Sequence, residues 1–138
     1  MFVKLNLHPE GKNVGDCVKR ALAKGFEIDY REMSLELNRL KKITGSKEFN
    51  DRENYRTYIT THGGVRLSFP AVTGKPRMNG ERMCLAYPKG RYILEMAGHT
   101  SVMVDGIIYD TFNCSEKCVY TAYKLPDATS IPRKIKLV

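Results

Sequence analysis

The fold is decided by residues 91–112, which read RYILEMAGHTSVMVDGIIYDTF. Apolar and β-branched residues recur here at the period of two that is typical of strands, in three runs over residues 91–97, 99–104 and 107–112. The dipeptide Asp105-Gly106 separates the last two runs, and both of its residues tolerate the positive φ that a two-residue hairpin turn requires. This stretch therefore predicts strands joined in an antiparallel sheet.

The same turn predicts which residues face each other across the hairpin. Counting outward from Asp105-Gly106 pairs Ser101 with Asp110 and His99 with Phe112. His99 and Asp110 then lie diagonally on one face, about 7 to 8 Å apart, which an imidazole ring and a carboxylate can close. A register shift of one residue would put them on opposite faces. The hairpin thus predicts a histidine–carboxylate pair that depends on the turn length.

Upstream of these strands, the apolar residues recur at helical spacing. A first helix is expected from Cys17 to Lys24, with Asp16 as its N-cap and Gly25 at its end. A second helix is expected between Asp29 and Gly45, with an apolar stripe of Met33, Leu37, Leu40 and Ile43. A third is expected from Asn50 through Ile59, ahead of Gly63-Gly64. A short fourth helix is expected over residues 79–87. A fourth strand is expected over residues 118–125.

Helices that come first and strands that follow predict an α+β fold, with N-terminal helices packed on a C-terminal antiparallel sheet. The length of 138 residues fits a single domain over 1–138, in which residues 126–138 form a possible flexible tail. The chain shows no internal repeat. Its apolar stretches are interrupted by Glu95 or Asp105 well short of the roughly 20 residues of a membrane helix. We therefore expect no membrane segment and, without a secretion signal, a cytoplasmic protein.

The net charge is +8, which attracts polyanions at low ionic strength. The lysines and arginines are scattered and never form a run of five or six, so nucleic-acid binding is possible but not favoured.

The four cysteines are Cys17, Cys84, Cys114 and Cys118, and we expect all of them to be free thiols. Cys114 and Cys118 could flank a turn before the last strand. A structural zinc site would need two further paired ligands, which the sequence does not offer. We therefore predict no metal and no cofactor.

Cys17 is the candidate nucleophile. It stands in the first turn of a predicted helix, whose positive end lowers the pKa of a thiol. A carboxylate beside an imidazole stabilises the protonated ring, so Asp110 and His99 would complete a catalytic set with Cys17. Against this, Cys17 also fits a buried helix face, and the neighbouring Asp16 would oppose thiolate formation. The spacing of these residues leaves both interpretations open.

Three segments resemble small, mostly uncharacterised papain-like cysteine peptidases encoded by bacteriophages. They are residues 15–22 (GDCVKRAL), 87–93 (YPKGRYI) and 98–111 (GHTSVMVDGIIYDT). The resemblance spans nearly the whole chain and implies a papain-like fold, in which a cysteine opens a helix packed against an antiparallel sheet. It implies Cys17 as nucleophile, His99 as general base and then acid, and Asp110 as the group that orients His99. For a phage protein, it also implies the host cytoplasm as location.

One feature departs from the family's pattern. Papain-like enzymes commonly place a glutamine several residues before the cysteine as an oxyanion-hole donor, and this chain has no glutamine. Asn13, together with the backbone N–H of Cys17, is the candidate oxyanion donor. Asn113 is an alternative third member of the triad, although its odd spacing from Asp110 puts it on the opposite face of the strand.

The sequence thus predicts a cysteine-dependent hydrolase, a peptidase, isopeptidase or amidase, with a peptide or protein substrate. Acyl transfer by the same residues stays open. The alternative is a catalytically inactive papain-like binding protein of phage origin that contacts a host factor or nucleic acid. The stretch from Gly63 to Asn79 is a possible wall of the substrate cleft.

Overall fold

The computed structural model describes residues 1–127, in which ten elements follow one another along the chain. The strands form one sheet in the order β1-β5-β4-β3-β6-β2. The elements are β1 (Phe2–Lys4), α1 (Cys17–Phe26), α2 (Tyr30–Thr44), α3 (Arg52–Thr61), β2 (Val65–Ser68), α4 (Gly80–Ala86), β3 (Arg91–Met96), β4 (His99–Val104), β5 (Ile107–Asp110) and β6 (Val119–Lys124). The α+β class predicted from the sequence is confirmed.

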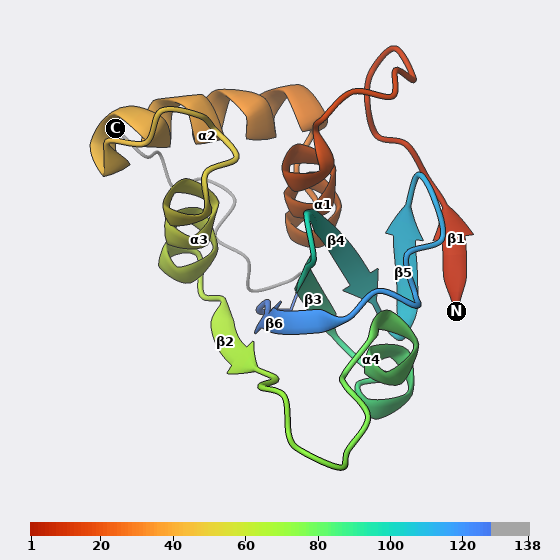
Figure 1. The fold of residues 1–138 in the computed structure, drawn as a ribbon. Helices are drawn as coiled ribbons and strands as arrows, with labels where there is room; N and C mark the ends of the chain where they lie inside the picture. Colours follow the sequence, from red (N-terminus) through yellow and green to blue (C-terminus); the bar gives the residue numbers. More distant parts are fainter. Residues whose placement is uncertain (128–138) are drawn as a thin grey trace.

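The helices cover both faces of the sheet, and a core lies on each side (Figure 1). The α1, α2 and α3 helices pack on one face, where Ile93, Val102 and Tyr123 of the strands meet Leu22 and Phe26 of α1. The short α4 packs on the other face. There Met83 and Cys84 join the residues of β3 that alternate with Ile93, such as Tyr92 and Leu94.

The hairpin register is confirmed. Val104 pairs with Ile107 and Met103 with Ile108, as a two-residue turn requires. Asp105 and Gly106 take the positive φ angles of 49° and 75°. The β4–β5 pairing runs out at Val102 and Tyr109, so the two strands separate at the end that carries His99 and Asp110.

Two strands were not predicted, and they change the sheet. β1 pairs in parallel with β5, so the sheet is mixed and not purely antiparallel. β2 lies at the opposite edge beside β6. With three and four residues, these strands are too short to show an alternating pattern. β5 ends at Asp110, two residues before the predicted end, because the chain turns there toward the loop that leads to β6.

The α1 helix continues through Gly25, where the sequence predicted its end. It ends at Phe26 with Glu27 in the left-handed conformation. A Cβ atom at position 25 would lie 2.9 Å from the Cδ1 atoms of both Ile93 and Leu125. Gly25 therefore allows α1 to approach the sheet closely, and it is a packing residue instead of a terminator. This close approach holds the end of α1 against β3 and β4.

The caps of the other helices agree only in part with the prediction. Asp29 caps α2 by accepting hydrogen bonds from the backbone N–H groups of Arg31 and Glu32. Ile43 was placed in the buried stripe of α2, which is wrong, because it is 60% exposed. The α3 helix starts after Asp51 and not after Asn50.

Asn79, where the predicted fourth helix begins, is the N-cap of α4, and its side chain accepts a hydrogen bond from the backbone N–H of Arg82. No helix within residues 1–127 is long and apolar enough to cross a membrane. The flexible tail predicted for residues 126–138 lies outside the described residues from position 128 onward.

Candidate active site

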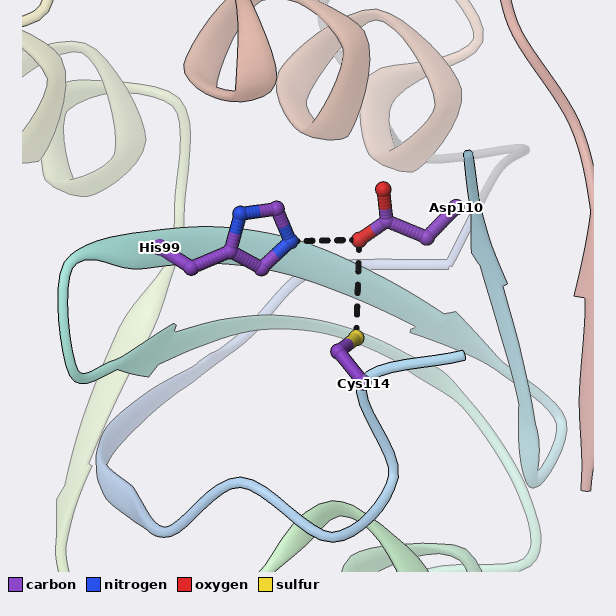
Figure 2. Close-up of side chains that lie close together, drawn as sticks. All are labelled: His99, Asp110 and Cys114. Carbon is purple, nitrogen blue, oxygen red and sulfur yellow. Dashed lines mark hydrogen bonds and ion pairs between the residues drawn. The ribbon is translucent and has the colours of Figure 1, made fainter. Parts of the chain in front are cut away.

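His99 and Asp110 point toward each other from β4 and β5 (Figure 2). His99 Nε2 lies 2.6 Å from Asp110 Oδ2, and both side chains are more than nine-tenths buried. The diagonal pair predicted from the turn is therefore present. The ladder between the two strands ends at Val102 and Tyr109, just before these two residues.

Asp110 is held by more than its histidine. Its Oδ2 atom also accepts a hydrogen bond from the Ser101 hydroxyl at 2.6 Å, and its Oδ1 atom accepts from the backbone N–H of Thr111 at 2.7 Å. Burial raises the pKa of Asp110, but the hydrogen bonds from His99 and Ser101 outweigh burial and lower the pKa below its usual range. Asp110 is therefore an ionised carboxylate with a fixed orientation.

Cys17 is the first residue of α1 and is half-buried beside His99. Burial raises the pKa of its thiol. Interaction with the His99 ring and with the backbone of Thr100 lowers it by more, so the net pKa lies below the ordinary value. Because His99 Nε2 is engaged by Asp110, the other ring nitrogen, Nδ1, is left for Cys17.

The histidine shows the opposite shift. Burial lowers the pKa of His99, but the hydrogen bonds to Asp110, Cys114 and Cys17 raise it to about 11. A lowered thiol pKa next to a raised imidazole pKa favours a thiolate–imidazolium pair at neutral pH. Cys17, His99 and Asp110 thus form one connected set, from α1, β4 and β5.

Arg20 connects the helix of the nucleophile to the strand of the carboxylate. It lies one turn after Cys17, is 8% exposed, and forms an ion pair with Asp16. Its Nη2 atom lies 3.7 Å from Asp110 Oδ1. The Asp16 carboxylate also accepts a hydrogen bond from the Tyr30 hydroxyl at 2.7 Å, and its side chain makes no cap hydrogen bond to α1. Asp16 is the N-cap residue of α1, as predicted, but its side chain does not bond the N–H groups of the helix. Its charge, which we expected to oppose the thiolate, is balanced by Arg20.

Cys114 reaches the same carboxylate from the loop between β5 and β6 (Figure 2). Its Sγ atom lies 3.5 Å from Asp110 Oδ2. One ligand atom each from His99, Asp110 and Cys114 lie within 4.8 Å of one another, a set that could ligate a metal ion. However, the 2.6 Å contact between His99 and Asp110 is a hydrogen bond, and a zinc ion with ligands at about 2.0 to 2.3 Å would have to separate the two groups. The arrangement fits a proton-sharing pair better than a metal centre.

A cleft of about 180 Å³ opens beside Cys17 and His99. One wall is formed by the start of α3 and the residues before it, including Asn50, Arg52 and Tyr55, and the other by the β3–β4 hairpin, including Glu95 and Gly98. The stretch from Gly63 to Asn79 was proposed as a wall and does not line this cleft. Its residues 68–78 instead border a separate, mostly apolar hollow.

Neither of the two asparagines that were predicted to take part in catalysis lines the cleft. Asn13 is exposed in the loop before α1 and lines neither of the two cavities that Cys17 borders. Asn113 accepts hydrogen bonds from the backbone N–H and hydroxyl of Ser115, which makes it a turn residue. Asn50, which the sequence places at the start of the third helix, is the asparagine that lines the cleft. No spacing relative to Cys17 indicated this, because residue 50 reaches the site through the packing of α3.

Comparison of the chain with models of known protein families, with curated proteins and with solved structures found no match. The resemblance to papain-like peptidases therefore stays a prediction.

Proposed function

We propose that the protein is a cysteine-dependent hydrolase, papain-like in its chemistry, that cleaves an amide, isopeptide or ester bond through a thioacyl intermediate. The observation that carries this proposal is the continuous set of contacts from Cys17 through His99 to Asp110, with the ring 2.6 Å from a buried carboxylate. A lowered thiol pKa in a cleft is the property that a nucleophilic cysteine requires.

In the first half of the reaction, the Cys17 thiolate attacks the carbonyl carbon of the substrate, and the carbonyl π electrons move to the oxygen. When the tetrahedral intermediate collapses, the bond to the leaving amine or alcohol breaks, and His99 donates its proton to that group. The products of this half are a thioester on Cys17, a free leaving group and a neutral imidazole.

In the second half, a water molecule gives its proton to neutral His99 and attacks the thioester carbon. The carbon–sulfur bond breaks, the carboxylic acid leaves, and the thiolate–imidazolium pair is restored. Asp110 stays ionised throughout, because its hydrogen bonds lower its pKa, and it stabilises the imidazolium each time it forms.

The proposal is tested by the pH dependence of Cys17 alkylation with iodoacetamide in the wild type and in His99→Ala. The wild type should show a thiolate pKa well below the free value of about 8.5. In His99→Ala this pKa should rise, because the hydrogen bond and the positive charge of the ring are lost while burial of the thiol remains. Peptide mapping by mass spectrometry assigns the alkylated cysteine.

The control for this experiment is His62→Ala. His62 is a buried histidine at the C-terminal end of α3, and its ring contacts Phe26 and Tyr58. The variant should leave the alkylation profile of Cys17 unchanged in folded protein. An ordinary Cys17 pKa that does not respond to His99 would contradict the proposal. That result would favour the binding protein that the sequence left as the alternative.

A second prediction concerns the donor that stabilises the oxyanion. Helix geometry leaves the backbone N–H of Cys17 without an acceptor in α1, so it is free to bind the negative oxygen. Asn50 lines the cleft, and we propose it as the second donor in place of Asn13. Asn50→Ala should lower kcat for p-nitrophenyl acetate by about 10²-fold, the usual effect of losing one such donor, whereas Asn13→Ala should stay near the wild type. The reverse ranking would restore the assignment made from the sequence.

A further inference from the structure

The cleft contains a carboxylate whose charge is already balanced. Glu95 is 6% exposed and accepts hydrogen bonds from Arg56 at 2.8 and 2.6 Å and from the Tyr55 hydroxyl. Burial raises the pKa of Glu95, but the hydrogen bonds from Arg56 and Tyr55 lower it below its usual range. Glu95 and Arg56 therefore form an ionised pair with no net charge, and neither is available to attract a substrate.

Arg52 is a cation of the cleft that takes no part in the ion pair between Glu95 and Arg56. It lines the cleft together with Cys17 and His99, and its side chain is exposed to solvent. No carboxylate of residues 1–127 forms an ion pair with it. The acidic residue that lines the cleft with it is Glu95, whose pKa it lowers and whose charge Arg56 already balances. Arg52 therefore adds to the cleft a positive charge that no ion pair within residues 1–127 balances.

A second cation lies close to this wall. The ammonium group of Lys19 sits 4.0 Å from the centre of the Phe49 ring, and Phe49 is the residue before Asn50. Lys19 belongs to α1, two residues after Cys17. A second positive charge therefore lies near the wall of the cleft that contains Asn50.

We propose that the cleft beside Cys17 binds an acyl substrate through a carboxylate of that substrate, which Arg52 recognises. This inference rests on the proposed function and names its substrate class. A guanidinium presents two parallel N–H groups that match the two oxygens of a carboxylate. A cleft of about 180 Å³ has room for one such group beside the scissile bond. The carboxylate could belong to an Asp or Glu side chain of a peptide or to its C-terminus.

The first test compares two reagents that alkylate Cys17 and differ in charge, anionic iodoacetate and neutral iodoacetamide. Each rate depends on the population of the thiolate, so their ratio cancels any change in the pKa of Cys17 and reports the local charge. Arg52→Gln should lower the ratio of the iodoacetate rate to the iodoacetamide rate about fivefold, the effect expected for one exposed charge pair. Added salt screens the charge of Arg52, so it should lower the wild-type ratio toward that of Arg52→Gln.

The matched control is Arg39→Gln. Arg39 is an exposed arginine of α2 that does not line the cleft, so this variant makes the same change in net charge elsewhere. Its rate ratio should equal that of the wild type. An unchanged ratio in Arg52→Gln, or an equal fall in both variants, would overturn the inference. Because alkylation needs no turnover, this result does not depend on whether the protein hydrolyses anything.

The second test separates the two sources of the carboxylate. Coumarin amides of N-acetyl-Asp and N-acetyl-Asn place the charge on a side chain, and acetyl-trialanine and its C-terminal amide place it at the end of a peptide. The preferred acid should lose about fivefold in kcat/KM relative to its neutral partner in Arg52→Gln, but not in Arg39→Gln. Turnover with no preference for either acid would overturn the inference and leave the proposed hydrolase standing. No turnover of any of these substrates, together with an alkylation ratio that falls in Arg52→Gln, would contradict the proposed hydrolase and leave the recognition of a carboxylate by Arg52 standing.

Discussion

Cys17→Ser is expected to lower kcat for p-nitrophenyl acetate by about 10⁴-fold or more, which is the usual effect of losing a covalent nucleophile. The substitution changes one atom, so the half-buried position at the start of α1 is kept. The hydroxyl does not ionise near neutral pH, so the lowered pKa that His99 and Thr100 give the thiol has no counterpart in the variant. Steady-state release of p-nitrophenol measures the effect.

The matched control is Cys118→Ser, because Cys118 is the other half-buried free cysteine of the chain. This variant should keep the wild-type rate and should still gain the mass of one acetyl group on the peptide that contains Cys17. If Cys17→Ser retains turnover while Cys118→Ser loses it, the nucleophile has been misassigned.

The hairpin shows how much of this site the sequence could predict. Asp105-Gly106 fixes the turn through its positive φ angles, and the turn alone then brings His99 and Asp110 to one place. The start of α1 was also predicted, because the helical spacing of Val18, Ala21 and Leu22 begins after Cys17. These are local patterns, and a short stretch of chain is sufficient to specify them.

The remaining parts of the site depend on contacts between distant segments, which no local pattern encodes. Arg20 was counted among the scattered basic residues, although it is buried between Asp16 and Asp110. Gly25 was interpreted as the end of α1 because glycine commonly ends helices, and its role in the packing of α1 on β3 is visible only in three dimensions. Asn50 likewise reaches the cleft only because α3 packs beside α1 and the sheet.

The second large effect is expected for Asp110→Asn, which should lower kcat/KM by about 10² to 10⁴ near neutral pH and narrow the pH profile. In the wild type, the thiolate–imidazolium pair exists above the lowered pKa of Cys17 and below the raised pKa of His99, which is about 11. The hydrogen bond to the Asp110 carboxylate is the main contribution that raises the pKa of His99, and a neutral amide accepts a weaker one and has no charge, so the upper limit falls. A weaker imidazolium also lowers the pKa of Cys17 less, so the lower limit rises.

One contribution acts in the other direction. The charge of Asp110 itself raises the pKa of Cys17, and its loss lowers that pKa, but this effect is the smallest of those that act on the thiol. The active range should therefore close from both sides, with two limbs that belong to the coupled pair and not to either residue alone. The profile of kcat/KM against pH measures both limbs.

Ser101→Ala separates this electrostatic role from a structural one. It removes the hydroxyl that donates to Asp110 at 2.6 Å but keeps the carboxylate and its 2.6 Å contact with His99. The variant should lose less than about tenfold in kcat/KM, the cost of one neutral hydrogen bond, and should keep the wild-type width of its profile. A profile of wild-type width in Asp110→Asn, accompanied by a lower Tm, would mean that Asp110 only holds β5 in place and that His99 is protonated without it.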